Sequence, residues 1–136
     1  MTYLPARCDT LMIPSGAAGD HLFFITTDAC AAGKHLLVNV TSIKPDRHVD
    51  DTCIIKAGEH RFVTHDSYIL YRGAIIDDGV RLGRMVDGWV YRKGDAASDE
   101  LTTRILAGFA DSPFTPRHVT AYLRGLSTAT GGEKVA

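Results

Sequence analysis

Residues 34–77 constrain the fold more than any other part of the chain, because three short apolar runs follow one another there and each adjoins polar residues. The runs cover residues 36–40, 52–55 and 67–76, and the last directly follows a His-Asp pair. Runs rich in β-branched and aromatic residues, bounded by turn-forming residues, predict β-strands. Hydroxyls, imidazoles, carboxylates and cations therefore gather at strand ends, where a sheet can hold them in a fixed geometry. The pattern supports a functional site without naming its reaction.

Other segments extend the predicted sheet. Residues 10–14 and 22–27 have strand-like composition, and residues 22–27 are expected to pair with residues 36–43 as a hairpin with a long loop. Gly73 lies inside the third apolar run, where a glycine marks a bulge or a tight bend. Residues 85–92 are interpreted as a further strand, although the Asp-Gly pair within them could equally form a turn.

The last third of the chain carries the signals of two helices. Ser98 is a good N-cap, and two acidic residues follow it in the first turn, where the helix dipole favours anions. Leu101, Ile105 and Phe109 repeat on one face of this helix, and a Ser-Pro pair ends it. Thr115 is expected to cap a second helix, which has a proline at its first position and an apolar stripe.

These elements predict one α+β domain over residues 1–136. The β part covers about residues 9–93, the helical part covers about residues 98–126, and residues 127–136 form a flexible tail. About six short strands spaced by turns favour a small, strongly bent antiparallel β-sheet or a half-open barrel, followed by the two C-terminal helices. A chain of 136 residues that is 45% apolar can bury a core without disulfides or a metal.

The bulk chemistry excludes some classes of protein. A formal net charge of -1 excludes a strongly basic protein that holds duplex nucleic acid by bulk electrostatics, although it is compatible with a local basic groove. The 3 cysteines are odd in number and none has a Cys-x-x-Cys spacing, so we interpret them as free thiols in a reducing compartment. With no signal-peptide pattern and no apolar run of about 18 residues, the sequence predicts a cytoplasmic protein.

The order of elements and three local strings resemble the MazF/PemK/Kid family of toxin ribonucleases. Residues 36–42, LLVNVTS, are similar to an apolar strand of that family that ends in Thr-Ser. Residues 68–77, YILYRGAIID, are similar to the strand that follows, and the helix over residues 101–109 is similar to the family's terminal helix. The resemblance implies an SH3-like barrel that forms a homodimer and is neutralised by an antitoxin protein. It also implies a toxin-like endoribonuclease of a toxin–antitoxin or mobile-element system, which cuts single-stranded RNA without a metal or another cofactor.

The chain departs from the family pattern where the family's charges usually stand. Family members commonly carry an arginine just before the second strand, where this chain has Gly-Asp-His at residues 19–21. The positions of their Arg-x-Asp pair on the later strand hold uncharged residues here, with Arg72 one residue further on. Thr41 and Ser42 alone carry over residue by residue, and the second helix is extra. A ribonuclease built on this chain would therefore use another acid and base.

The residues expected to carry such chemistry come from the strand ends. An unperturbed imidazole titrates at about pH 6.5, which suits His65 and His21 for proton transfer. Arg72 can hold a phosphate through two parallel hydrogen bonds, and Thr41 and Ser42 can donate hydrogen bonds to phosphate oxygens. The expected catalytic residues are thus His65, Arg72, His21, Thr41 and Ser42. The expected substrate-binding residues are Lys44, Ser67 and Tyr71.

The His-Asp-Ser sequence at residues 65–67 has two other interpretations. A Ser-His-Asp triad is disfavoured, because adjacent side chains on an extended strand point to opposite faces. The other interpretation is a turn before a strand, in which Asp66 or Ser67 caps backbone amides.

Two further questions are whether the chain binds a metal and whether it is an enzyme at all. The 6 histidines invite a metal hypothesis, but none of the established ligand spacings is present, so no metal is expected. The alternative function is a non-catalytic protein-binding module on the same barrel, such as an accessory protein of a phage or mobile element. The missing arginine before the second strand favours this alternative.

Overall fold

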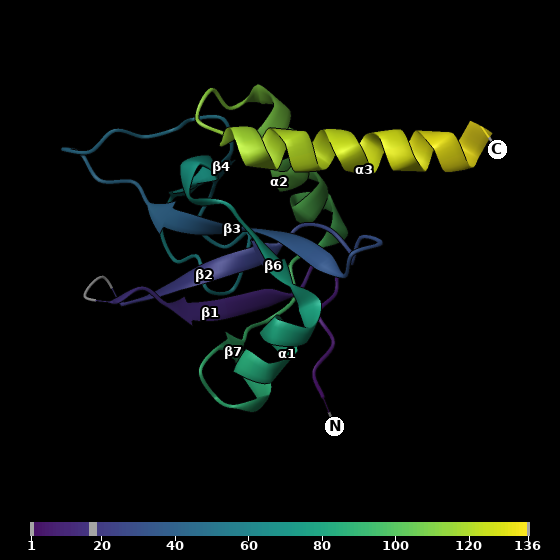
Figure 1. The fold of residues 1–136 in the computed structure, drawn as a ribbon. Helices are drawn as coiled ribbons and strands as arrows, with labels where there is room; N and C mark the ends of the chain where they lie inside the picture. The colour runs from purple at the N-terminus through teal and green to yellow at the C-terminus, as the bar shows by residue number, and fades with distance from the viewer. Residues whose placement is uncertain (1, 17–18, 136) are drawn as a thin grey trace.

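The computed structural model describes residues 2–16 and 19–135, with side chains described as far as residue 127. Figure 1 shows a bent sheet with a short helix below it and two longer helices above it. The strands are β1 (Thr10–Pro14), β2 (Asp20–Ile25), β3 (Lys34–Ser42), β4 (Ile54–Ile55), β5 (Ser67–Ile69), β6 (Ile75–Asp78) and β7 (Arg92–Lys93). The helices are α1 (Gly79–Asp87), α2 (Asp99–Asp111) and α3 (Arg117–Val135), and a 3-10 helix, η2, covers Tyr71–Gly73.

The central strand β3 pairs with three other strands, more than any other strand of the sheet does. Its residues 34–37 pair with β6 on one edge, and its residues 37–39 pair with β2 on the other. Its residues 40–42 pair with β5. Every pairing is antiparallel, and the strand order is β4-β5-β3-β2-β1-β7. Since β4 and β7 do not pair with each other in the described residues, the sheet is bent but open. The predicted α+β class, with its antiparallel sheet and C-terminal helix pair, is confirmed.

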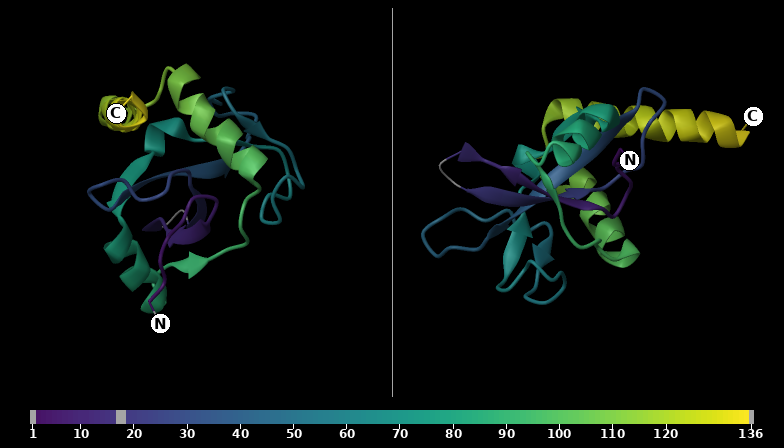
Figure 2. Two further views of the ribbon diagram at one scale, coloured as in Figure 1. Left: turned by 90° about the vertical axis from the view of Figure 1, so that its right-hand side faces the viewer. Right: turned by 90° about the horizontal axis from the view of Figure 1, so that it is seen from below.

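Both faces of the sheet are covered, which is why β2 and β3 are apolar along most of their length. On β2, Leu22 and Phe24 point into a core shared with α2 and α3, whereas Phe23 and Ile25 point into a second core with α1. This alternation is the period of two that a strand imposes on its side chains. Figure 2 shows α2 and α1 on opposite sides of the strands. The two cores hold β3 from both faces and so fix the position of its ends.

The helix α2 forms as the sequence predicts. The Ser98 hydroxyl accepts a hydrogen bond of 3.0 Å from the Leu101 amide, which satisfies one of the free donors at the helix N-terminus. The predicted stripe of Leu101, Ile105 and Phe109 lies buried in the first core.

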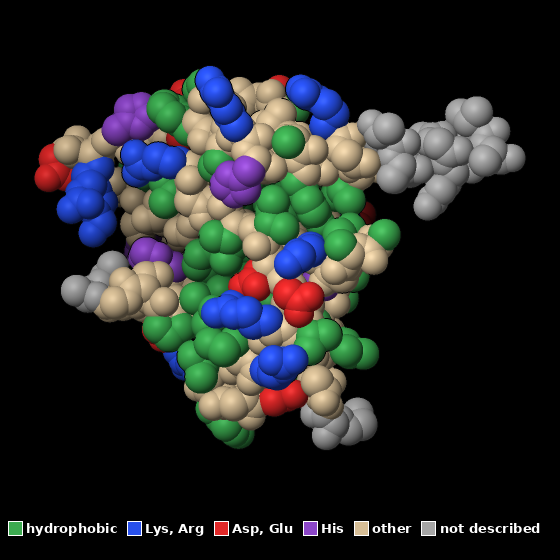
Figure 3. Space-filling view, in the orientation of Figure 1, with side chains coloured by type: hydrophobic (Ala, Val, Ile, Leu, Met, Phe, Trp, Pro, Cys, Tyr) green, Lys and Arg blue, Asp and Glu red, His purple; other side chains and the backbone are tan. Residues whose placement is uncertain are grey.

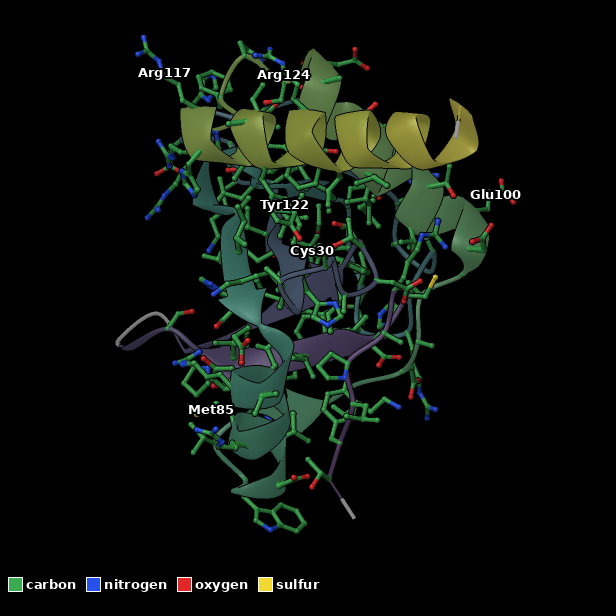
Figure 4. The ribbon with its side chains drawn as sticks, turned by 45° about the vertical axis from the view of Figure 1, so that its right-hand side comes forward. Cys30, Met85, Glu100, Arg117, Tyr122 and Arg124 are labelled. Atoms are coloured by element: carbon green, nitrogen blue, oxygen red, sulfur yellow. The ribbon has the colours of Figure 1, made fainter. Side chains whose placement is uncertain are left out.

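The helix α3 is longer than the sequence predicts. It runs through residues 127–135, which the sequence assigns to a flexible tail, and residue 136 lies outside the described residues. The Tyr122 hydroxyl donates a hydrogen bond of 3.1 Å to the Lys34 carbonyl, and Tyr122 points toward Cys30 in the loop between β2 and β3 (Figure 4). Among the described residues, no helix has both the length and the apolar character needed to cross a membrane.

The predicted strand over residues 67–76 is interrupted. The chain leaves β5, turns through η2 and resumes the pairing with β3 as β6. The bend falls at Gly73, as the sequence predicts, and a Cβ there would lie only 3.3 Å from Oδ1 of Asn39. Because η2 is a tight turn, adjacent side chains leave it in different directions, with Tyr71 in the core and Arg72 exposed.

The predicted strand over residues 85–92 is wrong, because its first residues belong to α1. The Asp78 carboxylate caps this helix by accepting a hydrogen bond of 3.0 Å from an amide of the first turn. Leu82 is fully buried in the second core, and Gly83 lies so close to the Tyr3 carbonyl that a Cβ would overlap it. Glycine is a poor helix former, and because α1 contains two glycines, its sequence does not predict a helix.

Candidate functional site

The adjacent ends of β3 and β5 carry most of the residues expected in the site. The pairing places Ser42 opposite Ser67. Thr41, Ser42 and Lys44 line two neighbouring cavities at once, and we call these three residues the ridge. Figure 3 shows Lys, Arg and His side chains gathered at the left of the molecule, over the loop that follows β3.

The two cavities differ in chemistry. One has a volume of ≈ 390 Å³, and its lining includes His21 and His65, so we call it the histidine cavity. The other has a volume of ≈ 360 Å³, and its lining includes Arg47 and Arg72, so we call it the arginine cavity. Seven of the eight residues that the sequence places in the site line one or both cavities.

The histidine cavity contains a serine–histidine pair. The Ser42 hydroxyl and Nε2 of His65 share a hydrogen bond of 2.5 Å, and Nδ1 of His65 lies 3.3 Å from the Thr64 hydroxyl. His21, the second residue of β2, lines the same cavity. Two imidazoles at one accessible cavity, one of them oriented by a hydroxyl, can deliver and remove protons at a bound molecule.

Ser67 has a supporting role in this pair. Its side chain is buried, and its hydroxyl donates a hydrogen bond of 2.9 Å to the His65 carbonyl. The hydroxyl is therefore committed to holding the backbone of the His65 turn, and the expected substrate-binding role of Ser67 is corrected accordingly.

Asp66 completes this turn and takes no part in a catalytic triad. Its carboxylate accepts hydrogen bonds from the Ala57 amide (3.1 Å) and from the Lys56 ammonium group (3.3 Å). These bonds, chiefly the one from Ala57, lower the pKa of the Asp66 carboxyl. Asp66, just before β5, thus binds a backbone amide, as the second interpretation of the sequence predicts, although that amide lies 9 residues away and not in the turn itself.

The arginine cavity is lined by three cations and by the carboxylates of Asp46 and Asp50, so positive charge is in excess by one. Lys44, Arg47 and Arg72 make no ion pair and no side-chain hydrogen bond with any described residue. Six other cations form ion pairs with Asp or Glu, namely Arg7, Lys56, Arg61, Arg81, Arg92 and Arg104. Lys34, Arg84, Lys93 and Arg117 show no ion pair with a described residue either, so the distinguishing feature of the cavity is that three such cations line it together. Cations left without a partner beside a cavity favour an anionic ligand there.

Asp50 fixes one wall of the arginine cavity, and sequence reasoning missed it. It is 6% exposed, and its carboxylate accepts hydrogen bonds from the Ser112 hydroxyl (2.6 Å) and from the amide and hydroxyl of Thr52 (3.1 and 2.6 Å). Burial alone would raise the pKa of the Asp50 carboxyl, but these hydrogen bonds outweigh it and leave the pKa below its ordinary value. The Asp-x-Thr spacing is typical of a local turn, so the hydrogen bonds from Thr52 could have been predicted from the sequence. The hydrogen bond from Ser112 could not, because Ser112 is 62 positions away.

The expected role of Tyr71 in substrate binding is wrong. Its side chain has 0% exposure, its hydroxyl donates a hydrogen bond of 2.7 Å to the Ile105 carbonyl, and its ring packs edge-on against Phe109. Burial raises the pKa of the Tyr71 phenol, so it stays protonated as a donor inside the core. The expectation assumed an extended strand, and the turn of η2 directs the ring inward instead.

The geometry can thus hold a phosphate on the ridge and move protons beside it. Thr41 and Ser42 offer hydroxyls, Lys44 and Arg72 offer positive charge, and His65 offers an imidazole next to Ser42. Within the described part of the chain, no three His, Cys, Asp or Glu side chains gather in a way that could hold a metal ion.

Comparisons of the chain with protein-family models, with curated proteins and with solved structures found no match. The function is therefore inferred from the site itself.

Proposed function

We propose that this protein is a toxin-like endoribonuclease that cuts single-stranded RNA without a metal. The observation that carries the proposal is the hydrogen bond of 2.5 Å between Ser42 and His65, at a ridge flanked by cations that have no ion-pair partner among the described residues. Cleavage of RNA through its own 2′-hydroxyl needs proton transfer and stabilisation of a charged phosphoryl group, and side chains of these types can supply both.

The reaction proceeds in one displacement. A base removes the proton of the 2′-hydroxyl, and the 2′-oxygen attacks the adjacent phosphorus. The bond from phosphorus to the 5′-oxygen breaks, and an acid protonates that oxygen, which leaves a 2′,3′-cyclic phosphate and a 5′-hydroxyl. His65 and His21 are the groups proposed for the two proton transfers, since both line the histidine cavity.

The ridge and the cations hold the reacting phosphate. Arg72 and Lys44 neutralise the charge that develops on the phosphoryl oxygens, and the hydroxyls of Thr41 and Ser42 donate hydrogen bonds to them. Because the Ser42 hydroxyl has a single proton, it donates to a phosphoryl oxygen when Nε2–H of His65 donates to it. Arg72 and Lys44 have no ion-pair partner among the described residues, so they need little reorganisation during the reaction, which makes them effective in stabilising a transition state.

The proposed setting follows from the same function. The enzyme belongs to a toxin–antitoxin or mobile-element system, acts in the cytoplasm as a homodimer and is neutralised by an antitoxin protein. The cysteines Cys8, Cys30 and Cys53 are free thiols, which is compatible with a reducing compartment.

Induced expression tests this function in cells. The chain should arrest growth and produce new cuts in cellular RNA, and the His65→Ala variant, expressed to the same level, should do neither. Growth arrest that is equal for the parent and the His65→Ala variant, without new RNA ends, would contradict the ribonuclease.

A non-catalytic protein-binding module remains the second candidate, because one observation favours it. Trp89 is 87% exposed and has a φ of 64°, a left-handed conformation that glycine normally provides after a helix. The Trp89 and Val90 amides bond to the carbonyls of Val86 (3.1 Å) and Met85 (2.9 Å), which closes the end of α1 with Trp89 held outward. A costly conformation that exposes an indole favours a protein contact at this surface. The contact would serve the homodimer of the enzyme or the partner of the binding module.

A further inference from the structure

The arginine cavity is lined by one phenylalanine, Phe114, to which the proposed chemistry gives no role. Phe114 lies in the connection between α2 and α3, is 41% exposed and lines the arginine cavity. The ring of His48, from the loop after β3, meets it edge-on, with ring centroids 5.1 Å apart and planes at 74°. Two loops far apart in the sequence therefore present aromatic rings to the same cavity that contains the unpaired cations.

A buried anchor keeps Phe114 in this position. The Phe114 amide donates a hydrogen bond of 3.1 Å to the Ser112 hydroxyl, which in turn donates one of 2.6 Å to the Asp50 carboxylate. Ser112 is 8% exposed, and the other oxygen of Asp50 accepts hydrogen bonds from Thr52. The connection between the helices is thus fastened to the loop that carries the cations. A ring held in this way is a preformed platform, which loses little entropy when a ligand stacks on it.

The cavity has the chemistry of a nucleotide site. The partly exposed ring of Phe114 and the apolar side chain of Leu70 suit a nucleobase, and Arg47 suits a phosphate. The volume of ≈ 360 Å³ falls within the range of about 300–1,000 Å³ that is usual for small-molecule sites. The carboxylate of Asp46 is exposed at the same cavity and can accept hydrogen bonds from an exocyclic amino group.

The position of the cavity relates it to the proposed cleavage site. Thr41, Ser42 and Lys44 line both cavities, so a phosphate that rests on the ridge has one neighbouring nucleotide on the side of the arginine cavity. We propose that the arginine cavity is a subsite for the nucleotide next to the scissile phosphate, with its base stacked on Phe114 and its own phosphate held by Arg47, while Arg72 stays with the scissile phosphate. This inference rests on the proposed ribonuclease function, and it adds a residue of the connection that leads into the extra C-terminal helix to the recognition of RNA.

Calorimetric titration with single-stranded 2′-deoxy tetranucleotides tests the subsite separately from cleavage, because these probes lack the 2′-hydroxyl that attacks the phosphate. Phe114→Leu removes the aromatic face and keeps an apolar side chain, whereas Phe114→Tyr keeps the face. Phe114→Leu should weaken binding by about tenfold or more, the loss expected for one base–aromatic stack. Phe114→Tyr should bind as the parent does, and so should Trp89→Leu, which changes an exposed aromatic residue that lines neither cavity.

Steady-state kinetics on single-stranded RNA give a second test, in which KM and kcat of the variant are compared with those of the parent. Phe114→Leu should raise KM by a similar factor and leave kcat unchanged, because the ring contacts a base and takes no part in proton transfer. If the parent cleaves RNA and Phe114→Leu matches it in both binding and KM, the subsite is wrong and the ribonuclease stands. If the parent binds no tetranucleotide but binds a polyglutamate peptide at the same cations, the subsite is overturned in favour of an acidic protein partner. If the parent binds the tetranucleotides through Phe114 yet cuts no RNA, the nucleotide site stands and the ribonuclease falls.

Discussion

The Ser42 hydroxyl lies 2.5 Å from Nε2 of His65, although the two residues are 23 positions apart in the chain. The contact exists because β3 and β5 pair antiparallel, so that Ser42, the last residue of β3, lies opposite Ser67, the first residue of β5. It places a hydroxyl and an imidazole on the ridge between two cavities, one of which is lined by cations with no ion-pair partner in the described residues. The proposed ribonuclease chemistry depends on this arrangement.

Removal of the His65 imidazole should disable the enzyme without unfolding it. His65→Ala should lower the rate of RNA cleavage by about a hundredfold or more, which is the usual contribution of a positioned general acid or base, and should flatten the pH profile around neutrality. The matched control is His118→Ala, since His118 is an exposed histidine that lines neither cavity. Initial rates on a labelled single-stranded RNA measure both. An equal rate for His65→Ala and His118→Ala would remove His65 from the mechanism.

Loss of the Arg72 guanidinium should affect the transition state and not the fold. Arg72→Ala should lower kcat by about a hundredfold, the cost of one charged hydrogen-bonding group at a transition state. Because Arg72 has no ion pair with a described residue, the circular dichroism spectrum and the unfolding midpoint of the Arg72→Ala variant should match those of the parent. Arg117→Ala, at an exposed position on α3, is the control for a lost surface charge. A full rate in Arg72→Ala would show that another cation holds the phosphate.

The parts of this structure that sequence reasoning predicted are those that local patterns determine. The Ser98 cap and the stripe of α2, and the pairing of β2 with β3, follow from capping chemistry and from strand composition. The grouping of polar side chains at the end of β3 and the start of β5 has the same origin, because polar residues adjoin apolar runs there. Local patterns of this kind survive in the fold wherever no distant contact opposes them.

The parts that could not be predicted depend on contacts between distant residues. The turn of η2 sends Tyr71 into the core, where its partner Ile105 is 34 positions away. The hydrogen bond from Ser112 to Asp50 spans 62 positions. The helix α1 contains glycines that disfavour a helix, and it forms because Leu82 is buried and the N-terminal segment packs against it. Neither a side chain's direction after a tight turn nor its long-range partner can be obtained from a single sequence.

Asp50 should stabilise the protein in a manner that depends on pH. Asp50→Asn should lower the free energy of unfolding by about 1–3 kcal/mol at neutral pH, because the buried hydroxyl and amide donors lose a charged acceptor. The folded-state pKa of Asp50 lies below its ordinary value, so the carboxylate stabilises the fold above the unfolded pKa of about 3.9, and that contribution is lost as the pH falls through the folded-state pKa. Urea unfolding of the parent and the variant should therefore converge in acid. Asp51→Asn, at the exposed neighbouring position, should show no such dependence; a constant difference for Asp50→Asn at all pH values would contradict the account.

Gly108 should tolerate no side chain while Tyr71 keeps its hydroxyl. A Cβ at Gly108 would overlap the Tyr71 hydroxyl, so Gly108→Ala should lower the free energy of unfolding by about 1–3 kcal/mol, the usual cost of overpacking a core. Tyr71→Phe removes that oxygen and leaves the ring Cζ, which a Cβ would meet at 2.6 Å, so the relief is partial. The double variant should still be more stable than the sum of the two single effects predicts. Gly125→Ala on α3, where a Cβ meets nothing within 4 Å, is the control and should be stabilising. Strict additivity of Gly108→Ala and Tyr71→Phe would disprove the clash.

Trp89 should contribute to association, although its left-handed backbone conformation costs stability. Trp89→Gly should leave the free energy of unfolding unchanged or raise it by up to about 1 kcal/mol, because glycine adopts the left-handed conformation freely. The same change should convert the proposed homodimer into a monomer, as measured by light scattering at micromolar concentration. A variant that remains dimeric would place the interface elsewhere, and a parent that is strictly monomeric would count against the toxin-like enzyme.

The most direct test is incubation of the purified protein with a single-stranded RNA in the presence of EDTA, at several values between about pH 5 and pH 9, a range that brackets the ordinary pKa of an imidazole. The account predicts new fragments that end in a 2′,3′-cyclic phosphate and begin with a 5′-hydroxyl, and it predicts their loss in His65→Ala. If the parent leaves the RNA intact at every pH, with or without EDTA, the enzyme is ruled out and the protein-binding module becomes the better account of this fold.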